Sequence, residues 1–219
     1  MPGRMSTDLA ADLPPPQRLA LAYAPASARP ATLALLALDA RLGAILRARR
    51  EPIAAQLRLA WWRDMLARPQ AEWPRGEPLL EALRCWRQPA CLAPLASAWE
   101  ALLGDELTRS AIVEFGDGRG QAFAGLAGEL AAGPAEHAAA AGRVWALADL
   151  AANLSDGDER ARVVEHARGL PPPARLPAAL RPLAVLAGLG RAALARGGGP
   201  LLAGPRSTLA ALRIGFTGR

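Results

Sequence analysis

The chain has 219 residues, of which 52% are hydrophobic, so it is long and apolar enough to build a sizeable core and is not a disordered chain. Ala and Leu dominate the hydrophobic fraction and only 5% of residues are aromatic, so the residues that strands favour are scarce and an all-β fold is excluded. All 26 basic residues are Arg, and against 20 acidic residues they give a net charge of +6.

The positive charge alone does not identify a partner. The Arg residues are spread singly along the chain and form no dense block, so we do not expect a nucleic-acid partner. The two cysteines, Cys85 and Cys91, have no further Cys or His close by in the sequence. They are too few ligands for zinc and too weak a pattern for a disulfide framework, so a reducing compartment is expected.

The first 17 residues carry Asp8, Asp12 and a run of three prolines without a continuous apolar stretch, which predicts a flexible leader and not a signal peptide. Residues 18–219 are predicted to form one helical domain, because neither an internal repeat nor a charge-rich linker divides them. The longest apolar stretches fall far short of the roughly 20 residues that a membrane-spanning helix needs. We expect a cytoplasmic protein, either soluble or bound peripherally to a membrane.

Apolar residues at helical spacing predict four helices in the first half of the chain. The first runs from about Pro30 to Arg49 and ends before Pro52, since proline cannot continue the hydrogen-bond ladder. A loop rich in turn residues, Pro69–Pro78, follows the second helix. The inward faces of the four helices are predicted to consist of Leu35, Leu38, Leu42 and Ile45, then Leu59, Trp62 and Leu66, then Leu79, Leu83 and Trp86, and finally Leu92, Leu95, Trp99 and Leu102.

In the second half of the chain, the segment Gly116–Gly120 is predicted to be a loop that interrupts the helical pattern. A helix over Gln121–Leu130 is predicted to stop at Gly133, and the next starts near Ala135 and ends near Asn153. The remaining predicted elements are a helix over Arg160–Arg168, a proline-rich loop over Gly169–Pro177, a helix over Ala178–Arg196 and a last segment over Ser207–Phe216. An all-α domain of about eight to ten helices is therefore expected.

The segment Ala111–Phe115, followed by Gly116–Gly120, has a second interpretation as a strand that runs into a Gly-rich nucleotide-binding loop. Such a fold needs several more strands alternating with helices, and the sequence supplies no second convincing one. A loop between helices is the preferred interpretation.

Two aspartates in the predicted helices, Asp39 and Asp149, are candidates for a metal site. Two acids four residues apart project from one helix face and can jointly hold Mg²⁺. Asp39 has Gly43 four positions on, and Asp149 has Asn153, an uncharged and weaker oxygen ligand. Each aspartate is also compatible with an ordinary polar helix position or a local ion pair.

The segment Arg58–Asp64 places two Trp between two Arg on one predicted helix. Trp62 lies on the apolar face and is predicted to be core, while Trp61 lies beside that face. Arg63 is able to cover an aromatic ring, pair with an acid or bind an anion, and these alternatives stay open.

Four segments of the sequence carry a resemblance to a known family, and they are Tyr23-Ala-Pro25, Arg29 to Asp39, Leu59-Ala-Trp-Trp-Arg-Asp64, and Gly142 to Asn153. Together they resemble the squalene/phytoene synthase family. In that family an Arg opens the helix that carries the first aspartate-rich motif, and the next helix contains a Trp-Arg pair. Gly142 to Asn153 looks like the helix with the second aspartate-rich motif. The resemblance spans roughly residues 18–215 and is best over 18–66.

The resemblance implies an isoprenoid-synthase-like helical bundle around a central cavity. Active members condense two prenyl diphosphates head to head, and Mg²⁺ ions held by the two aspartate-rich motifs bind and ionise the diphosphate. The resemblance would make Asp39, Asp149 and Asn153 the catalytic positions, with Asp39 and Asp149 as the metal ligands. Arg29 and Arg63 would be the diphosphate-binding residues.

The sequence departs from the family pattern at the positions of the metal ligands. Gly43 follows Asp39 by four residues, and Asn153 and Gly157 stand where the family has the two Asp of its second motif. Each Mg²⁺ ion needs several oxygen ligands, so one or two isolated acids do not balance a diphosphate and its metal ions. We therefore expect a degenerate member, a pseudoenzyme that needs no cofactor and binds a prenyl or lipid ligand or a protein partner. Degenerate relatives of this family include an assembly factor that looks like a synthase without a full set of metal ligands.

Two alternatives remain at this point. An active prenyl (farnesyl or geranylgeranyl) diphosphate transferase would hold Mg²⁺ with Asp39 and Asp149 and meet the diphosphate with Arg29 or Arg63. A helical nucleic-acid-binding or scaffold protein is supported by the net charge alone. If Asp39 and Asp149 face each other across an apolar cavity, the transferase is favoured, whereas a centre filled by Leu and Trp favours a binding protein.

Overall fold

The computed structural model describes residues 9–48, 51–204, 209 and 211–215 of the chain. Within these ranges the chain forms helices and loops and contains no strand, so the all-α expectation is confirmed. The α-helices are α2 (Pro15–Leu21), α3 (Arg29–Arg47), α4 (Pro52–Ala67), α5 (Pro78–Leu83), α6 (Ala93–Glu100), α7 (Arg109–Glu129), α8 (Ala135–Asn153), α9 (Gly157–Arg168) and α10 (Arg181–Ala195). Short 3-10 helices are η1 (Gln70–Glu72), η2 (Pro89–Leu92), η3 (Ala101–Leu103) and η4 (Ala178–Leu180).

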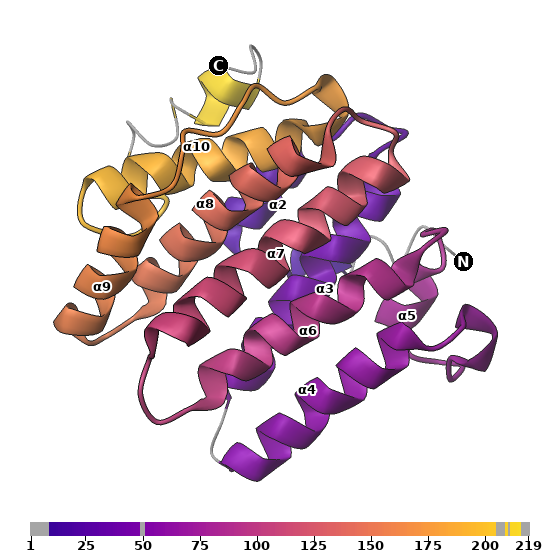
Figure 1. Ribbon diagram of the computed structural model, residues 1–219. Coiled ribbons are helices and arrows are strands. Elements are labelled where there is room, and N and C mark those ends of the chain that lie inside the picture. Colours follow the sequence, from indigo (N-terminus) through magenta and orange to yellow (C-terminus); the bar gives the residue numbers. More distant parts are fainter. Residues whose placement is uncertain (1–8, 49–50, 205–208, 210, 216–219) are drawn as a thin grey trace.

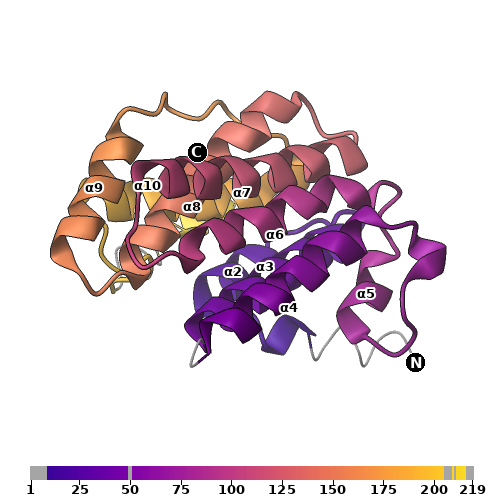
Figure 2. The ribbon, with the colours of Figure 1, turned by 60° about the horizontal axis from the view of Figure 1, so that its bottom comes forward.

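Five of the helices form a row in which each contacts the next, in the order α10, α8, α7, α6 and α4 (Figure 1). The helices α2 and α3 lie behind this row, where α2 contacts α10 and α3 contacts α6 and α7 (Figure 2). The helix α9 packs against α8 at one end. Because α7 stands in the middle of the row and also contacts α3, its side chains reach the centre of the molecule.

Several helices begin where the sequence supplies a start signal. Proline occupies the first turn of α3, α4, α5, α6 and α10, where the missing N–H has no helical partner to lose. The Thr108 side chain accepts a hydrogen bond from the Ala111 N–H at 3.1 Å, and Asp156 accepts one from the Glu159 N–H at 2.8 Å. Each such cap stabilises its helix by about 1 kcal/mol.

The prediction of a loop at Gly116–Gly120 is wrong, because α7 runs through these residues without a break. A glycine inside a helix costs about 1 kcal/mol relative to alanine, but here close packing outweighs that cost. A Cβ added to Gly118 would lie 2.6 Å from the Ala98 Cβ on α6, and one added to Gly120 would lie 2.8 Å from the Ala139 carbonyl oxygen on α8. The glycines therefore let α7 approach both neighbours in the row.

The predicted leader over residues 1–17 is wrong for residues 9–17, because this stretch belongs to the fold. Leu13 and Gln17 are buried, and α2 begins at Pro15. Residues 1–8 lie outside the described residues, as does part of the predicted last segment Ser207–Phe216, of which residues 211–215 are helical. Trp86 is buried as predicted but lies beyond the end of α5, and its indole N–H donates to the Ala31 carbonyl at 3.2 Å.

One stretch of the described chain, Ala178–Ala195, is long and apolar enough to cross a membrane by length and composition. Half of it is buried inside the protein, where α10 packs against α8 and α2. This burial is typical of the core helix of a globular bundle.

Two glycines of α7 provide a matched test of the close packing. We expect Gly118→Ala to lower the free energy of unfolding by roughly 1–3 kcal/mol, because the new methyl group collides with α6. Gly128→Ala, in the same helix with nothing within 4 Å of the added Cβ, should leave stability unchanged or raise it by about 1 kcal/mol. Urea unfolding followed by circular dichroism measures both. Equal effects of the two substitutions would contradict the packing explanation.

Candidate functional site

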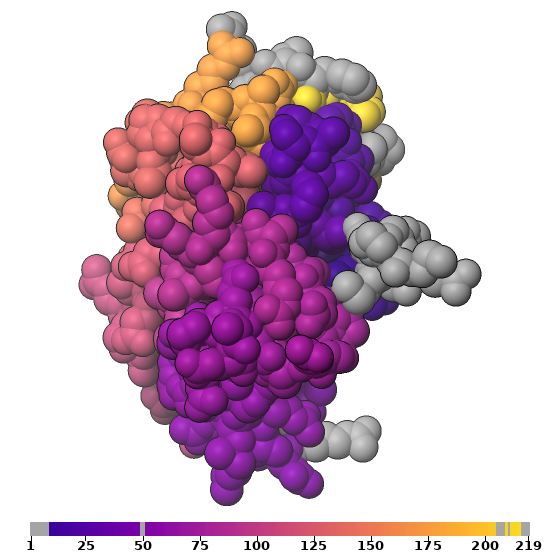
Figure 3. Space-filling view, turned by 90° about the vertical axis from the view of Figure 1, so that its right-hand side faces the viewer, coloured from indigo at the N-terminus to yellow at the C-terminus, as the bar shows by residue number. Residues whose placement is uncertain are grey.

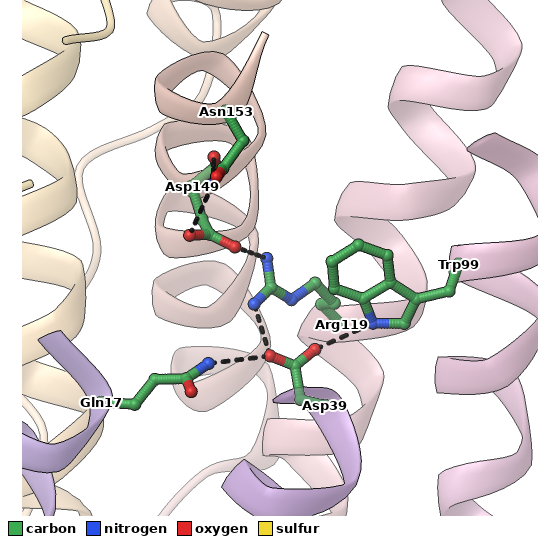
Figure 4. A network of polar contacts seen from close by, with 6 residues as sticks. All are labelled: Gln17, Asp39, Trp99, Arg119, Asp149 and Asn153. Atoms are coloured by element: carbon green, nitrogen blue, oxygen red, sulfur yellow. Dashed lines mark hydrogen bonds and ion pairs between the residues drawn. The ribbon is translucent and has the colours of Figure 1, made fainter. Parts of the chain in front are cut away.

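The centre of the bundle is occupied by a network of polar side chains built around Arg119 of α7 (Figure 4). The Arg119 guanidinium donates through Nη2 to Asp39 Oδ2 at 2.6 Å and through Nη1 to Asp149 Oδ2 at 2.9 Å. Asp39 also accepts from Gln17 Nε2 at 3.0 Å and from Trp99 Nε1 at 3.0 Å. The network therefore joins five helices, α2, α3, α6, α7 and α8, through hydrogen bonds between side chains.

Aromatic rings enclose the guanidinium. The Arg119 Cζ atom lies 3.9 Å from the centroid of the Trp145 ring, 5.1 Å from that of Phe115 and 5.2 Å from that of Trp99. A cation is attracted to the face of such rings, more strongly where water is excluded. Because the Arg119 side chain is fully buried, the rings and the two carboxylates together replace its hydration.

Burial and charge act in opposite directions on the acid at the centre. Burial raises the pKa of Asp39 above its ordinary value of 3.8, and the ion pair and hydrogen bond with Arg119 lower it by less. The negative charge of Asp149 adds to the increase, while the hydrogen bond from Trp99 opposes it. Burial is the largest of these effects, and it leaves the pKa of Asp39 raised although the carboxyl is paired with Arg119.

The guanidinium stays charged. Burial lowers the pKa of Arg119, but the carboxylates of Asp39 and Asp149 outweigh that effect and raise the pKa above its ordinary value. Two buried atoms of the network, Gln17 Oε1 and Arg119 Nε, have no hydrogen-bond partner among the described residues. The network is thus held together by the ion pairs of Arg119 and by the hydrogen bonds donated to Asp39, while these two polar atoms remain unsatisfied among the described residues.

Asp149 lies at the edge of the network, next to a pocket. Its side chain is 26% exposed, and Asn153 donates to its Oδ1 at 3.3 Å and to its backbone carbonyl at 2.8 Å. The pocket measures about 330 Å³. Its lining consists of Leu46, Arg47, Trp99, Leu102, Gly104, Asp105, Glu106, Leu107, Phe115, Asp149, Leu150, Asn153, Leu154, Ser155 and Glu159.

The donor set at the centre does not fit Mg²⁺. A hard cation needs several free oxygen ligands, yet both oxygens of the Asp39 carboxylate accept hydrogen bonds and Arg119 lies between Asp39 and Asp149. The Asn153 amide nitrogen, not its oxygen, is the atom directed at Asp149. Within the described ranges, no three His, Cys, Asp or Glu side chains gather in a group that could hold a metal ion.

The glycine that follows Asp39 by four residues is explained by the same network. A Cβ added to Gly43 would lie 2.9 Å from Cη2 of Trp99, closer than real contacts of this kind. An acid at this position would displace the indole that donates to Asp39. Gly157 has a different setting, at the first turn of α9, where an added Cβ would meet nothing within 4 Å.

The two arginines expected to bind diphosphate lie elsewhere. Arg29 begins α3 and donates to the Leu21 carbonyl at 2.9 Å. Arg63 forms ion pairs with Glu100 at 2.6 Å and with Asp64 at 3.2 Å. Neither arginine lines the pocket beside Asp149. The structure therefore brings together Asp39, Asp149 and Asn153, and it leaves Arg29 and Arg63 in separate contacts.

Sequence reasoning missed the cation of the site. Arg119 was hidden within the supposed loop Gly116–Gly120, and Gln17 within the supposed leader. A signal for Arg119 exists, because Phe115, Arg119, Ala122 and Leu126 follow one another at helical spacing, and all four are buried. An arginine in such an apolar stripe requires buried acids as partners, and Asp39 and Asp149 are those acids.

Comparison with protein-family models, with characterised proteins and with solved structures finds no match to this chain. The functional interpretation of the site therefore rests on its geometry and charge.

Replacing Arg119 tests how the network is held. We expect Arg119→Met to lower the free energy of unfolding by about 3–5 kcal/mol at neutral pH, because it leaves buried carboxylates without their cation. The variant raises the pKa of Asp39 further, so the folded protein retains a proton that the unfolded chain releases above pH 3.8. The stabilisation that comes from this proton is fully present below pH 3.8. It is lost as the pH rises through the pKa of Asp39 in the folded variant.

The decrease in the free energy of unfolding of Arg119→Met relative to the wild type should accordingly be smallest near pH 4 and should grow toward neutral pH. Adding Asp39→Asn to Arg119→Met removes the titrating group and should flatten this dependence. Urea unfolding across that pH range measures both effects. A decrease in the free energy of unfolding that is the same at every pH would contradict the role of Asp39 as the titrating group.

Proposed function

We propose that the chain is a non-catalytic binding protein built on a helical framework that resembles the squalene/phytoene synthases. The observation that carries the proposal is the position of Arg119, whose guanidinium pairs with both Asp39 and Asp149. In a working transferase these two carboxylates would have to be available to metal ions and diphosphate. Here one internal cation pairs with both of them, so the proposed pseudoenzyme keeps its acids as structural partners.

Removing Arg119 from this position to admit a metal would be costly. Arg119 is fully buried and Asp39 is 3% exposed, so opening the site breaks two charge-assisted hydrogen bonds and separates the cation from its rings. Breaking a buried ion pair costs roughly 3–5 kcal/mol. This energy supports a permanent structural role for the network.

The space at the site also favours binding over condensation of two substrates. The rings of Trp99, Phe115 and Trp145 pack around Arg119 at the centre. The pocket beside Asp149, at about 330 Å³, is near the lower end of the range for ligand pockets. It suits part of a single prenyl or lipid chain, whereas head-to-head condensation requires room for two chains.

The charge of the pocket lining selects the kind of ligand. The lining contains four carboxylates, those of Asp105, Glu106, Asp149 and Glu159, and one arginine, Arg47. Asp149 is paired with Arg119 and Glu159 with Arg162, which leaves Asp105 and Glu106 as the acids without an ion pair among the described residues. A diphosphate would be repelled by this excess of negative charge, while the leucines of the lining favour an apolar chain. We therefore infer that the ligand is an uncharged prenyl or lipid molecule.

The absence of transfer chemistry is directly testable. With farnesyl or geranylgeranyl diphosphate and Mg²⁺, the purified wild-type protein should release no diphosphate above the rate of a buffer blank. A coupled pyrophosphate assay measures this, with heat-denatured protein as the control. Diphosphate release that Asp39→Ala abolishes would instead establish the alternative function, a Mg²⁺-dependent prenyl transferase.

The choice of ligand gives a second test. Farnesol should bind at least roughly tenfold more tightly than farnesyl diphosphate, since the diphosphate meets the acidic lining. Leu154→Trp should fill the pocket and weaken farnesol binding by a similar factor. Leu170→Trp, at a partly buried leucine that does not line this pocket, is the matched control and should bind normally. Isothermal titration calorimetry measures all three, and tighter binding of the diphosphate would contradict the inferred ligand.

A further inference from the structure

The helix α4 carries apolar side chains on two opposite faces. Its core face contains Leu59, Trp62 and Leu66, which are buried. On the other side, Ile53 is 74% exposed, Leu57 66% and Trp61 40%. These three residues follow one another at intervals of four, so they form a single stripe about 12 Å long on the outward side of the helix.

The position of α4 leaves this stripe accessible. The helix stands at the end of the row, beyond α6, and forms the lower margin of the molecule in Figure 1. In the space-filling view the purple segment that contains α4 likewise forms the lower end of the molecule (Figure 3). The Trp61 ring is held against Trp62 in an edge-to-face contact, with centroids 5.0 Å apart, so an exposed aromatic ring is held on the surface.

Charges of both signs lie on and beside α4, with a small excess of arginine, and they are Arg58, Arg63 and Arg68 against Glu51 at the helix N-cap and Asp64. Arg58 is exposed on α4 and Arg68 is exposed at its end, and neither forms an ion pair or a side-chain hydrogen bond within the part of the chain that the structure describes. Asp64, the one acid within the helix, is 60% exposed and lies on the same side as the stripe, three residues after Trp61, where it is paired with Arg63. Two cations without partners thus flank an apolar stripe whose last member is a tryptophan.

We propose that this outward face of α4, consisting of Ile53, Leu57, Trp61, Arg58 and Arg68, docks the protein on the surface of an anionic lipid bilayer. The aliphatic side chains would enter the boundary between headgroups and acyl chains, and Trp61 would lie at that boundary, where indole rings are favoured. Arg58 and Arg68 would remain at the level of the lipid phosphates, whose negative charge matches theirs. The inference does not depend on the ligand of the pocket.

A second copy of the chain is the weaker candidate for this face. Stable interfaces between proteins bury roughly 800 Å² on each partner. Three partly exposed side chains supply only a few hundred Å², on the order of the largest apolar patch of an ordinary monomer. A bilayer needs no complementary groove, so a narrow ridge with flanking cations is sufficient for it.

Vesicle flotation tests the proposal with the full chain. The wild type is expected to float with vesicles of equal parts phosphatidylcholine and phosphatidylglycerol and to bind pure phosphatidylcholine vesicles much less. Ile53→Ser with Leu57→Ser should lower the partition coefficient roughly tenfold or more, because two inserted aliphatic side chains are lost. Arg58→Ala should lower it by about fivefold.

The matched control replaces two exposed leucines elsewhere on the protein. Leu209 and Leu212 lie in the C-terminal segment and are 64% and 38% exposed, close to the values for Leu57 and Trp61. Leu209→Ser with Leu212→Ser should leave vesicle binding unchanged, and circular dichroism checks that each variant is folded. The proposal is overturned if the wild type does not bind anionic vesicles, or if Ile53→Ser with Leu57→Ser binds them as well as the wild type does. It is also overturned if light scattering shows that the wild type is a dimer and that this variant is a monomer.

Discussion

A buried positive charge is the constraint on which the structure depends. A guanidinium with no exposed surface has a large desolvation cost unless acids and hydrogen bonds replace water. Asp39 on α3 and Asp149 on α8 provide the charges, and Trp99 on α6 and Gln17 on α2 donate to Asp39. Because these four residues come from four helices, satisfying Arg119 fixes how those helices are placed around α7.

The glycines beside Arg119 and Trp99 are explained by the same constraint. Gly118 and Gly120 bring α7 close to α6 and α8, and Arg119 stands between them in the sequence. Gly43 leaves room for the indole of Trp99. The positive charge between Asp39 and Asp149 is supplied by a side chain, and this is the observation that supports our proposal of a binding protein.

Much of the fold could be predicted from periodicity, because leucine and tryptophan spacing predicts buried faces such as Leu59, Trp62 and Leu66 correctly. Asp39 and Asp149 could be named from the sequence as candidate site residues, and in the structure both pair with the guanidinium of Arg119. Arg119 was missed because glycine-rich sequence is typical of loops, whereas tertiary packing here outweighs local propensity. Gln17 was missed because a proline run resembles a leader, although α2 begins within that run.

We propose that Arg119, and not a metal ion, holds Asp39 and Asp149 together. Titration of the wild-type protein with Mn²⁺, followed by the electron paramagnetic resonance signal of the free ion, tests this most directly. We expect the signal to rise in proportion to added Mn²⁺, as it does in buffer. Binding of one or more Mn²⁺ ions per chain that is lost in both Asp39→Asn and Asp149→Asn would contradict it.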